Sequence, residues 1–461
     1  MADQQLIYNC PGCGKPTPSP EGALTNKCEY CNLVVRIGGP HRILKYFYPT
    51  KINAYGARIA VDRYLKKQGL PLSGKIIKSE FFYLPFYRFR GMALDYLAPT
   101  VEMVEVAEDV QIPARTKCKL KGKEFDITIP AFTDKEFGLI SLGIRPHAVP
   151  LYAFSRQDIP EGTTIVSSDI PPHKARHQAM EIHKHNVSLY NKSKPIYSAM
   201  IGERLSVIYF PIWAVTHETN GMQMTVFVDA LADRGYSHKD KPFDYKGKIS
   251  TEENSYFLKP LRHQCPYCGA DLKERYFSLF YPCKNCGRSY LLRDEGYSEV
   301  KCQAVDTPLC VPFWRFPLEF NGQRHYKTVR DFSKLLPAEL ALMRKQKKNN
   351  RFYLYSPAFK ATDVNRWVKR ALSVIKTQPH DKLYDRLPAL GPVLCIDEDE
   401  AKEMAVFLWR VATSKYVNLR KGEFQFDVNY LQSGEIVWLP VEDHQLLGKS
   451  LGYKEVNVLK N

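Results

Sequence analysis

Long apolar runs are lacking in this chain of 461 residues. The most apolar stretch, SVIYFPIWAV at 206–215, includes a proline and is far shorter than the ~20 apolar residues that a membrane helix needs. The first ten residues do not combine a basic segment with an apolar one, as a signal peptide would. We therefore expect no transmembrane segment and a cytoplasmic location.

Short catalytic motifs are also lacking. The sequence has no phosphate-binding glycine loop, no dinucleotide-binding glycine pattern, no His-Glu-x-x-His and no Gly-x-Ser-x-Gly elbow. Histidines 173, 177, 183 and 185 are interspersed with Lys and Arg, which favours a solvated helix over a metal site. The carboxylates at 397–400 fit helix capping better than acid-base chemistry. The sequence therefore favours a non-enzymatic role.

Acidic residues are scarce relative to basic ones. The chain has 66 Lys and Arg against 49 Asp and Glu, a net charge of +17 that attracts nucleic acid, an acidic protein or the periphery of an anionic surface. Residues 339–376 contain ten basic and two acidic residues. The predicted polyanion-binding residues there are Arg344, Lys345, Lys347, Lys348, Arg351, Arg366, Lys369 and Arg370. In a smaller cluster, basic residues alternate along 115–123 and are expected to line one face of a strand.

Cysteine, in contrast, is plentiful and regularly spaced. Each of two Cys-x-x-Cys pairs is followed, after 14 residues, by another such pair. The predicted metal ligands are Cys10, Cys13, Cys28 and Cys31, and Cys265, Cys268, Cys283 and Cys286. Gly14, Gly269, Gly287 and Asn32 follow these pairs and suit the left-handed backbone of a metal knuckle. Because four thiolates leave no coordination position open, we predict two structural zinc ions.

Both cysteine segments resemble the zinc-ribbon family, over residues 8–36 and 263–292. The resemblance implies a structural zinc and a rubredoxin-like knuckle fold. A ribbon this short depends on metal for folding, because it buries little apolar surface. The alternative is a single iron at each site and a rubredoxin-like electron carrier, although the 14-residue gap favours zinc. Four further cysteines have no partner at ligand spacing and are expected to be small core residues: Cys118, Cys302, Cys310 and Cys395.

One proline-aromatic pattern recurs along the chain. Residues 84–89, 210–215 and 311–316 share the order apolar, proline, apolar, aromatic, variable, apolar, and 355–360 is a weaker fourth copy. Asn-Gly pairs at 220–221 and 321–322 predict β-hairpins. Since proline cannot donate to a ladder, we expect these strands to be first or edge strands. Their aromatic residues are expected in the core rather than on a base-stacking platform, because their neighbours are apolar.

A second element recurs as well. Ile52, Ile170 and Ile396 are each followed five residues later by alanine, and Asn53 and Asp397 are suitable N-caps, which predicts a helix after each isoleucine. The expected unit is a helix, a proline-aromatic strand and a hairpin. Together with the amino-terminal ribbon, this order resembles a group of uncharacterised bacterial proteins with four-cysteine zinc ribbons and repeated proline-aromatic β modules.

The predicted fold class is α+β, with repeated β-rich modules, associated helices and two four-cysteine zinc ribbons. The predicted divisions are a ribbon at 1–38, α+β modules at 39–150 and 151–260, a second ribbon at 261–297, a β-hairpin module at 298–338 and a basic α+β module at 339–461. We expect a zinc-binding adaptor or scaffold that docks to a larger assembly. The alternative is a factor that binds RNA or DNA directly.

Overall fold

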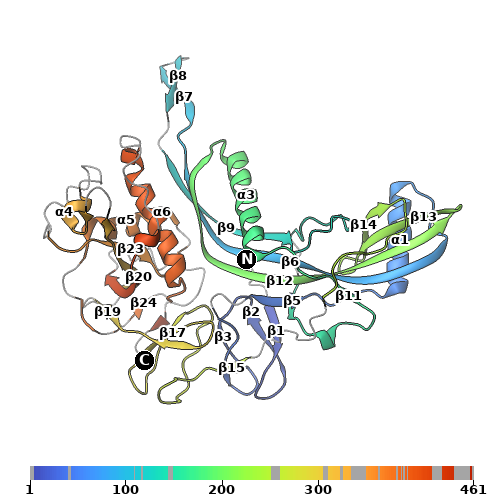
Figure 1. Cartoon of the computed structure of the whole chain (residues 1–461), viewed down its shortest axis with the longest axis horizontal. Helices are drawn as coiled ribbons and strands as arrows, with labels where there is room; N and C mark the ends of the chain where they lie inside the picture. The colour runs from blue at the N-terminus through green and yellow to red at the C-terminus, as the bar shows by residue number, and fades with distance from the viewer. Residues whose placement is uncertain are drawn as a thin grey trace. The chain divides into compact units, whose positions relative to one another are not determined.

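The computed structural model divides the chain into two compact units, each built from separate segments (Figure 1). Unit 1 comprises Met1–Arg90, Asp126–Ile182 and Arg204–Arg262, and unit 2 comprises the remainder. The structure describes residues 5–39, 43–107, 110–115, 118–143, 149–250, 260–304, 310–321, 325–333, 349–361, 364–379, 383–385, 387, 390–391, 393–417, 428–440 and 457–458. Within these ranges, no helix is long and apolar enough to cross a membrane.

Four elements contribute residues to both units: β6 (Lys75–Leu97), β9 (Lys119–Pro130), β12 (Pro195–Thr219) and α3 (Pro172–Asn191). The other elements of unit 1 are β1 (Gln5–Asn9), β2 (Pro16–Pro20), β3 (Thr25–Lys27), β4 (Val34–Arg36), β5 (Leu44–Phe47), α1 (Ala54–Gln68), β10 (Leu151–Ala153), η1 (Arg156–Asp158), β11 (Thr164–Ile165), β13 (Met222–Asp229), β14 (Arg234–Lys239) and β15 (Leu261–Arg262).

Unit 2 contains short strands and three further described helices. Its elements are β7 (Val101–Ala107), β8 (Val110–Arg115), β16 (Phe280–Pro282), β17 (Ser289–Leu292), β18 (Tyr297–Glu299), β19 (Cys302–Ala304), β20 (Cys310–Pro317), β21 (Phe320–Asn321), β22 (His325–Tyr326), α4 (Val329–Phe332), β23 (Tyr353–Pro357), α5 (Val364–Thr377), β24 (Leu390–Gly391), α6 (Glu398–Val417), η3 (Val428–Tyr430), β25 (Glu435–Pro440) and β26 (Asn457–Val458). The mixture of helices and several sheets is the predicted α+β class.

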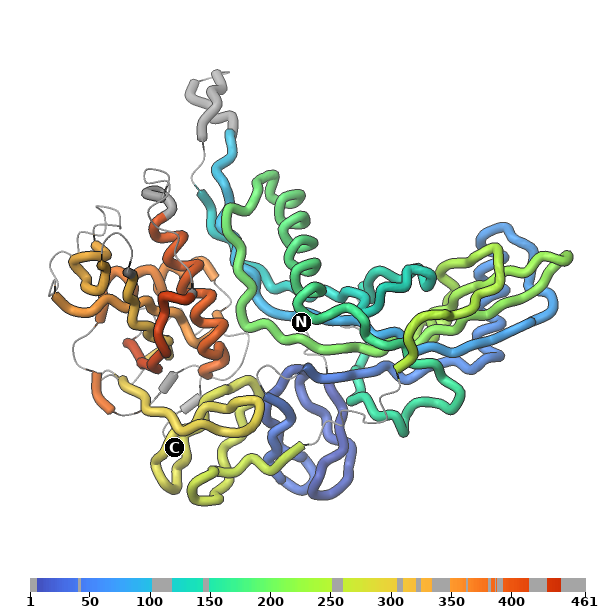
Figure 2. The backbone as a smooth tube through the Cα atoms, in the orientation of Figure 1, coloured from blue at the N-terminus to red at the C-terminus, as the bar shows by residue number. Residues whose placement is uncertain are grey.

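The main sheet of unit 1 is built around two long neighbouring strands. Its order is β11-β6-β12-β5-β10-β1-β2, with β9 paired to β6 and β13 and β14 continuing from β12. Figure 2 shows the tube of β6 beside that of β12. At the turn from β12 to β13, Asn220 and Gly221 have φ values of 52° and 75°. Two positive φ values are those of a type I′ hairpin, so this predicted hairpin is confirmed.

Helix α1 packs on β13 and β14 through one apolar face. The Asn53 side chain accepts a hydrogen bond from Gly56 N at 3.0 Å, which confirms the predicted N-cap. Ala57, Val61 and Leu65 recur at helical spacing and are wholly buried. They pack against valines of β12 and β13, namely Val215, Val226 and Val228. The apolar spacing of the helix therefore sets which face meets the sheet.

The expectation that the proline strands lie at sheet edges is wrong. β6 lies between β11 and β12, β12 lies between β6 and β5, and β20 lies between β25 and β23. The physical reason is that a proline can stand where a long strand changes partners. β5 pairs with 206–209 and β13 pairs with 212–219, so Pro211 falls between the two ladders. There its missing N–H leaves no ladder position empty.

The same backbone contact recurs at each proline of the three clear motifs. The proline carbonyl accepts a hydrogen bond from an alanine amide that follows a neighbouring strand. The pairs are Ala131 N to Pro85 O at 2.9 Å, Ala230 N to Pro211 O at 3.2 Å, and Ala358 N to Pro312 O at 3.0 Å. In each motif, the proline therefore lies beside the end of a neighbouring strand.

The aromatic residue of each motif also makes one recurring contact, to the isoleucine that precedes a helix. The contacts are Tyr87 OH to Ile170 O at 2.9 Å, Trp213 Nε1 to Ile52 O at 3.4 Å, and Trp314 Nε1 to Ile396 O at 2.8 Å. In unit 1 these bonds join β6 to the start of α3 and β12 to the start of α1. β6 therefore bonds to α3, and β12 bonds to α1. The sequence suggested instead that each helix goes with the strand that follows it, which would pair α1 with β6 and α3 with β12.

Unit 2 contains a four-stranded sheet in the order β19-β25-β20-β23. Trp314, Trp367, Trp409 and Trp438 are among its largest fully buried side chains. Asp397 Oδ1 accepts hydrogen bonds from Asp399 N and Glu400 N at 2.9 and 3.0 Å, which confirms it as the cap of α6. The predicted core role of the aromatic motif residues is confirmed for Tyr87 and Trp314, which are buried, whereas Trp213 is half-buried.

Candidate metal centres

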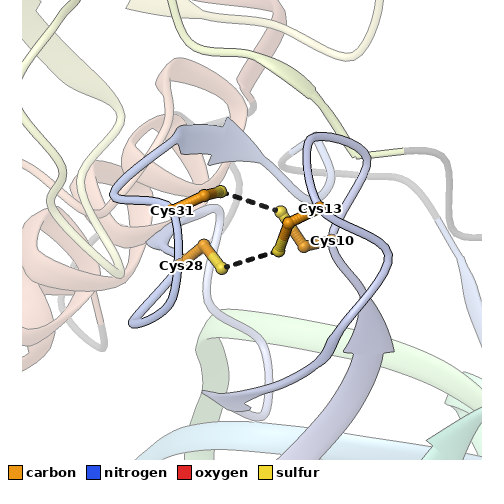
Figure 3. A group of neighbouring side chains, drawn as sticks. All are labelled: Cys10, Cys13, Cys28 and Cys31. Atoms are coloured by element: carbon orange, nitrogen blue, oxygen red, sulfur yellow. Dashed lines mark hydrogen bonds between the residues drawn. The ribbon is translucent and has the colours of Figure 1, made fainter.

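Two groups of four cysteines could each hold a metal ion, and within each group all sulfurs lie within 4.8 Å of one another. In the first group, the Sγ–Sγ distances are 3.6 Å for Cys10–Cys31 and 3.7 Å for Cys13–Cys28. Figure 3 shows these four side chains pointing toward a common centre. In the second group, the distances are 3.8 Å for Cys265–Cys286 and 3.6 Å for Cys268–Cys283.

These distances fit tetrahedral metal coordination. Four sulfurs at ~2.3 Å from a zinc ion would be separated from one another by ~3.8 Å, the edge of that tetrahedron. A disulfide would bring two sulfurs to ~2.05 Å, and all eight cysteines carry free thiols. Each group therefore has the donor set, the number of ligands and the spacing that a closed four-cysteine zinc site requires.

Local backbone geometry explains why each pair of cysteines converges. The residue after the second cysteine has φ values of 73° at Gly14, 61° at Asn32, 72° at Gly269 and 72° at Gly287. In each knuckle its amide donates to the carbonyl of the first cysteine, as in Gly14 N to Cys10 O at 2.8 Å. Glycine adopts this left-handed conformation freely, and asparagine tolerates it. The expected knuckle geometry is thus present at all four pairs.

Hydrogen-bond donors around one sulfur in each group favour the thiolate form that a metal needs, whereas the pKa of Cys31 is raised to about 11 despite donation from the Leu33 amide, and burial raises the pKa of Cys283 to about 11. Burial acts to raise the pKa of Cys28, but donation from the Cys31 amide and the Thr17 hydroxyl outweighs it, and the pKa is lowered to about 6. For Cys265, burial is again opposed by donation from the Cys268 amide and the Tyr290 hydroxyl, and its pKa is also lowered to about 6. One cysteine in each group is therefore set to ionise near neutral pH.

Each group also has a cation stacked on an exposed tyrosine of a knuckle. Lys15 Nζ lies 4.4 Å from the centroid of the Tyr30 ring, and Arg288 Cζ lies 3.6 Å from that of Tyr267. Lys15 and Arg288 each stand two residues after a ligand cysteine. Four thiolates around a divalent ion carry a net charge of about −2, so these cations stand where they offset that charge.

The first ribbon is built into the main sheet of unit 1. Its strand β1 pairs in parallel with β10, with Leu6 opposite Leu151. Between β2 and β3, Glu21 accepts hydrogen bonds from Arg88 Nη1 at 2.6 Å and from Arg90 Nη1 at 2.8 Å. Arg88 also donates to Asp126 of β9 at 2.8 Å, and its side chain is fully buried. A satisfied buried ion network therefore joins ribbon and sheet.

The second ribbon is joined to the carboxyl-terminal part of unit 2. Leu279 N donates to Leu394 O at 2.7 Å. The rings of Phe280 in β16 and Trp438 in β25 meet edge to face, with centroids 5.9 Å apart. Leu279, Phe280 and Trp438 are buried, so this contact belongs to the core. Both ribbons are thus integral parts of their units.

The predicted polyanion-binding residues are in different situations. Arg366 and Lys369 are exposed on α5. Arg370 donates to Pro440 O at 2.6 Å, and Arg351 donates to Gln432 Oε1 at 2.8 Å, so these two guanidinium groups have internal partners. Arg344, Lys345, Lys347 and Lys348 lie outside the described residues. Polyanion binding by this set stays a prediction.

The histidine-rich helix contains an anchor that the sequence did not indicate. His173 and His177 are both exposed on α3, as expected for a solvated helix. His183, in contrast, is buried and lies 3.0 Å from the Asp95 carboxylate, which also accepts a hydrogen bond from Ser198 at 2.7 Å. In a catalytic triad the imidazole lies between acid and hydroxyl, whereas here the acid lies between them. This cluster therefore serves to hold α3 on the sheet.

Within the described residues, the two cysteine quartets are the sole groupings of three or more His, Cys, Asp or Glu side chains with ligand geometry. Cys302, Cys310 and Cys395 are buried, as expected, and Cys118 is half-buried. No protein-family model, no curated protein and no solved structure matches the chain. The two candidate metal centres are consistent with zinc ribbons on the geometry of their own cysteines.

Proposed function

We propose that the protein is a non-enzymatic zinc-binding scaffold that docks to a larger macromolecular assembly. The observation that supports this most directly is the closure of both four-cysteine groups, in each of which two pairs of sulfurs are 3.6–3.8 Å apart and all four lie within 4.8 Å of one another. A zinc ion with four protein sulfurs has no position for water or substrate. Its contribution is then to the folding of the ribbon, which is the role of structural zinc.

The integration of the ribbons supports the scaffold role further. Ribbon 1 provides Glu21 to the buried arginine network of unit 1, and ribbon 2 provides Phe280 to the core of unit 2. Loss of either metal would remove these contacts together with the knuckles. We infer that the metals fix the shape of each unit, and that a partner recognises this shape.

Zinc is the metal that we assign to both sites, and rubredoxin-like electron transfer by iron is the competing assignment. The two are separated by metal analysis and visible spectroscopy of the full chain purified from its host. Two zinc equivalents in a colourless protein support the structural role. A red protein with iron in either site would contradict that role, because iron in four thiolates is redox-active.

Direct nucleic-acid binding is the second candidate function. The exposed positions of Arg366 and Lys369 on α5 favour it, since basic side chains on a helix surface can contact phosphates without disturbing the core. Its test is the salt dependence of affinity, because each phosphate contact releases counterions. A scaffold that docks only to protein need not have that dependence.

The docking role is tested by recovery of the tagged full chain from its host under mild crosslinking. We compare the wild type, Cys268→Ser and Cys118→Ser, because Cys118 lies outside both cysteine groups. The expected result is a stoichiometric protein partner that resists nuclease and is lost only with Cys268→Ser. A wild-type chain that migrates alone would contradict the scaffold role, and a partner lost on nuclease treatment would favour nucleic-acid binding.

A further inference from the structure

One face of strand β9 changes along its length from apolar to basic. Phe125 is buried on this face, whereas Lys119, Lys121 and Lys123 are exposed. These four residues alternate in sequence and therefore point to the same side of the strand. The regular alternation predicted for the smaller basic cluster is thus present over 119–123.

The last part of α3 runs along this face of β9. The rings of His183 and Phe125 have centroids 6.4 Å apart. Further along the helix, Lys123 Nζ lies 5.8 Å from the centroid of the Tyr190 ring, and Lys121 Nζ donates to Asn191 Oδ1. The helix ends at Asn191. It therefore covers the apolar part of the strand face and ends beside the lysines.

The opposite face of β9 is held against another helix. Gly122 packs so closely on Val364, the first residue of α5, that an added Cβ would lie 2.1 Å from Val364 Cγ1. Gly122 points away from Lys121 and Lys123, because successive strand residues alternate between faces. The lysines consequently project from a strand that is fixed on its other side, and they form an ordered array.

The charges of Lys121 and Lys123 are not offset by the partners that the structure describes for them. The described partners of Lys121 and Lys123 are neutral, namely an amide oxygen and an aromatic ring. Alternate strand residues are ~6.8 Å apart, so the ammonium groups of Lys121 and Lys123 repel one another. The carboxyl end of α3 supplies only a partial negative charge. A chain of negative charges along the strand would relieve this repulsion.

An exposed aromatic ring adjoins the array. Tyr190 is 81% exposed, so most of its ring is accessible. Single-stranded nucleic acid binds to surfaces that combine aromatic rings with a line of cations, because its bases stack on the rings while its backbone follows the charges. We propose that the lysine face, defined as Lys119, Lys121, Lys123 and Tyr190, binds single-stranded nucleic acid. This site goes beyond the scaffold role and stands without it.

The linear geometry favours nucleic acid over an anionic membrane. Three cations along one strand match a polymer with one charge per unit. A membrane would contact a plane of lipid headgroups, and its apolar interior would favour several exposed apolar side chains on one helix face. The lysine face offers one accessible ring beside its cations. We therefore assign the lysines to consecutive phosphates and Tyr190 to one base.

The test uses the zinc-loaded full chain and a fluorescent oligouridylate of about 20 nucleotides, longer than the ~4–16 nucleotides of a single binding site. Anisotropy gives the affinity between about 50 and 200 mM salt, where counterion release is pronounced. Reversal of Lys119, Lys121 and Lys123 to Glu should reduce the magnitude of the slope of log affinity against log salt by about 2. Each of the three lost phosphate contacts accounts for ~0.7 of that slope. Tyr190→Ala should weaken binding by about 5- to 150-fold, as for loss of one stacked base.

Matched controls decide the outcome. Tyr190→Phe keeps the ring and should bind like the wild type. Reversal of Lys66, Lys246 and Lys248, which are exposed in unit 1, makes the same change of net charge elsewhere and should leave the slope unchanged. Equal weakening by both triple variants would overturn the proposal, as would tighter binding to phosphatidylserine vesicles than to the oligonucleotide. If the lysine variant fails to fold, the comparison of Tyr190→Ala with Tyr190→Phe still decides.

Discussion

Glu21 and Arg88 form an ion pair in the interior of unit 1, with Glu21 Oε2 accepting a hydrogen bond from Arg88 Nη1 at 2.6 Å. The side chain of Arg88 is 0% exposed and that of Glu21 is 4% exposed. Glu21 lies in the first ribbon, between the two cysteine knuckles, and Arg88 lies in the proline-aromatic motif of β6. The pair therefore couples metal-dependent folding of the ribbon to the long strand of the sheet.

Glu21→Gln should destabilise the ribbon by about 3 kcal/mol, because removal of one member of a buried ion pair leaves charge without its partner. Asp126 continues to pair with Arg88, which limits the loss to the lower end of the usual range. The measurement is hydrogen exchange of the amides in β1 to β4, which gives the free energy of local opening. Glu161→Gln, at an exposed position, is the control and should not change exchange there. Equal protection in the two variants would contradict the coupling.

Cys268→Ser should reduce bound zinc from two equivalents to one, because a hydroxyl does not replace the thiolate ligand. The reason for choosing Cys268 is its place in the second group, 3.6 Å from Cys283. Unfolding should be confined to ribbon 2 and the parts of unit 2 that contact Phe280 and Leu279. Metal analysis and hydrogen exchange check both effects. Cys118→Ser should retain two equivalents, since Cys118 belongs to neither group. Two equivalents in Cys268→Ser would refute the ligand assignment.

Local signals in the sequence predicted local structure well. The spacing of the cysteines, the glycines after them and the caps at Asn53 and Asp397 each act within a few residues, so their outcome depends little on the rest of the fold. The Asn220-Gly221 hairpin is of the same kind. These features could be predicted because the chemistry that fixes them is contained in the segment itself.

Long-range relationships could not be predicted in the same way. The rule that places proline in an edge strand assumes that a strand keeps the same neighbours along its whole length. It failed for Pro211 because β12 changes partner there. The buried pairs Glu21–Arg88 and Asp95–His183 join residues far apart in the chain, and each residue alone suggested a surface position. Only the register of the strands brings them together.

Trp314→Phe should destabilise unit 2 by about 1–2 kcal/mol more than Trp438→Phe, because only the first removes a hydrogen bond and leaves a buried carbonyl unpaired. Trp314 Nε1 donates to Ile396 O at 2.8 Å. Trp438 Nε1 is buried without a partner among the described residues. Both side chains are buried in neighbouring strands of one sheet, so the loss of ring volume is matched. Hydrogen exchange of β20 and β25 measures the difference, and equal effects would show that the recurring aromatic bond adds no stability.

The stability of unit 1 should fall with decreasing pH through His217. This side chain is 1% exposed in β12, Nε2 has no partner in the described part of the chain, and Nδ1 lies 3.2 Å from Thr219 Oγ1. Burial lowers the pKa of His217, although the charge of Asp62 acts in the opposite direction. The folded pKa therefore lies below the unfolded value of ~6.5, so the neutral form adds stability above that pH, and this stability is lost as the pH falls below it.

The measurement compares wild type and His217→Gln by hydrogen exchange of the β12 and β13 amides, at a pH above and a pH below ~6.5. His217→Gln should lose less protection on acidification than the wild type, because glutamine does not bind a proton. Acid also protonates the cysteine ligands and so releases metal, which is a second cause of acid sensitivity. His185→Gln is the control for this effect, because it changes an exposed histidine of α3 and keeps His217. Metal loss is common to all three proteins, so the difference between the two variants isolates His217. Identical acid sensitivity in His217→Gln and His185→Gln would place the pH dependence in the cysteine sites instead.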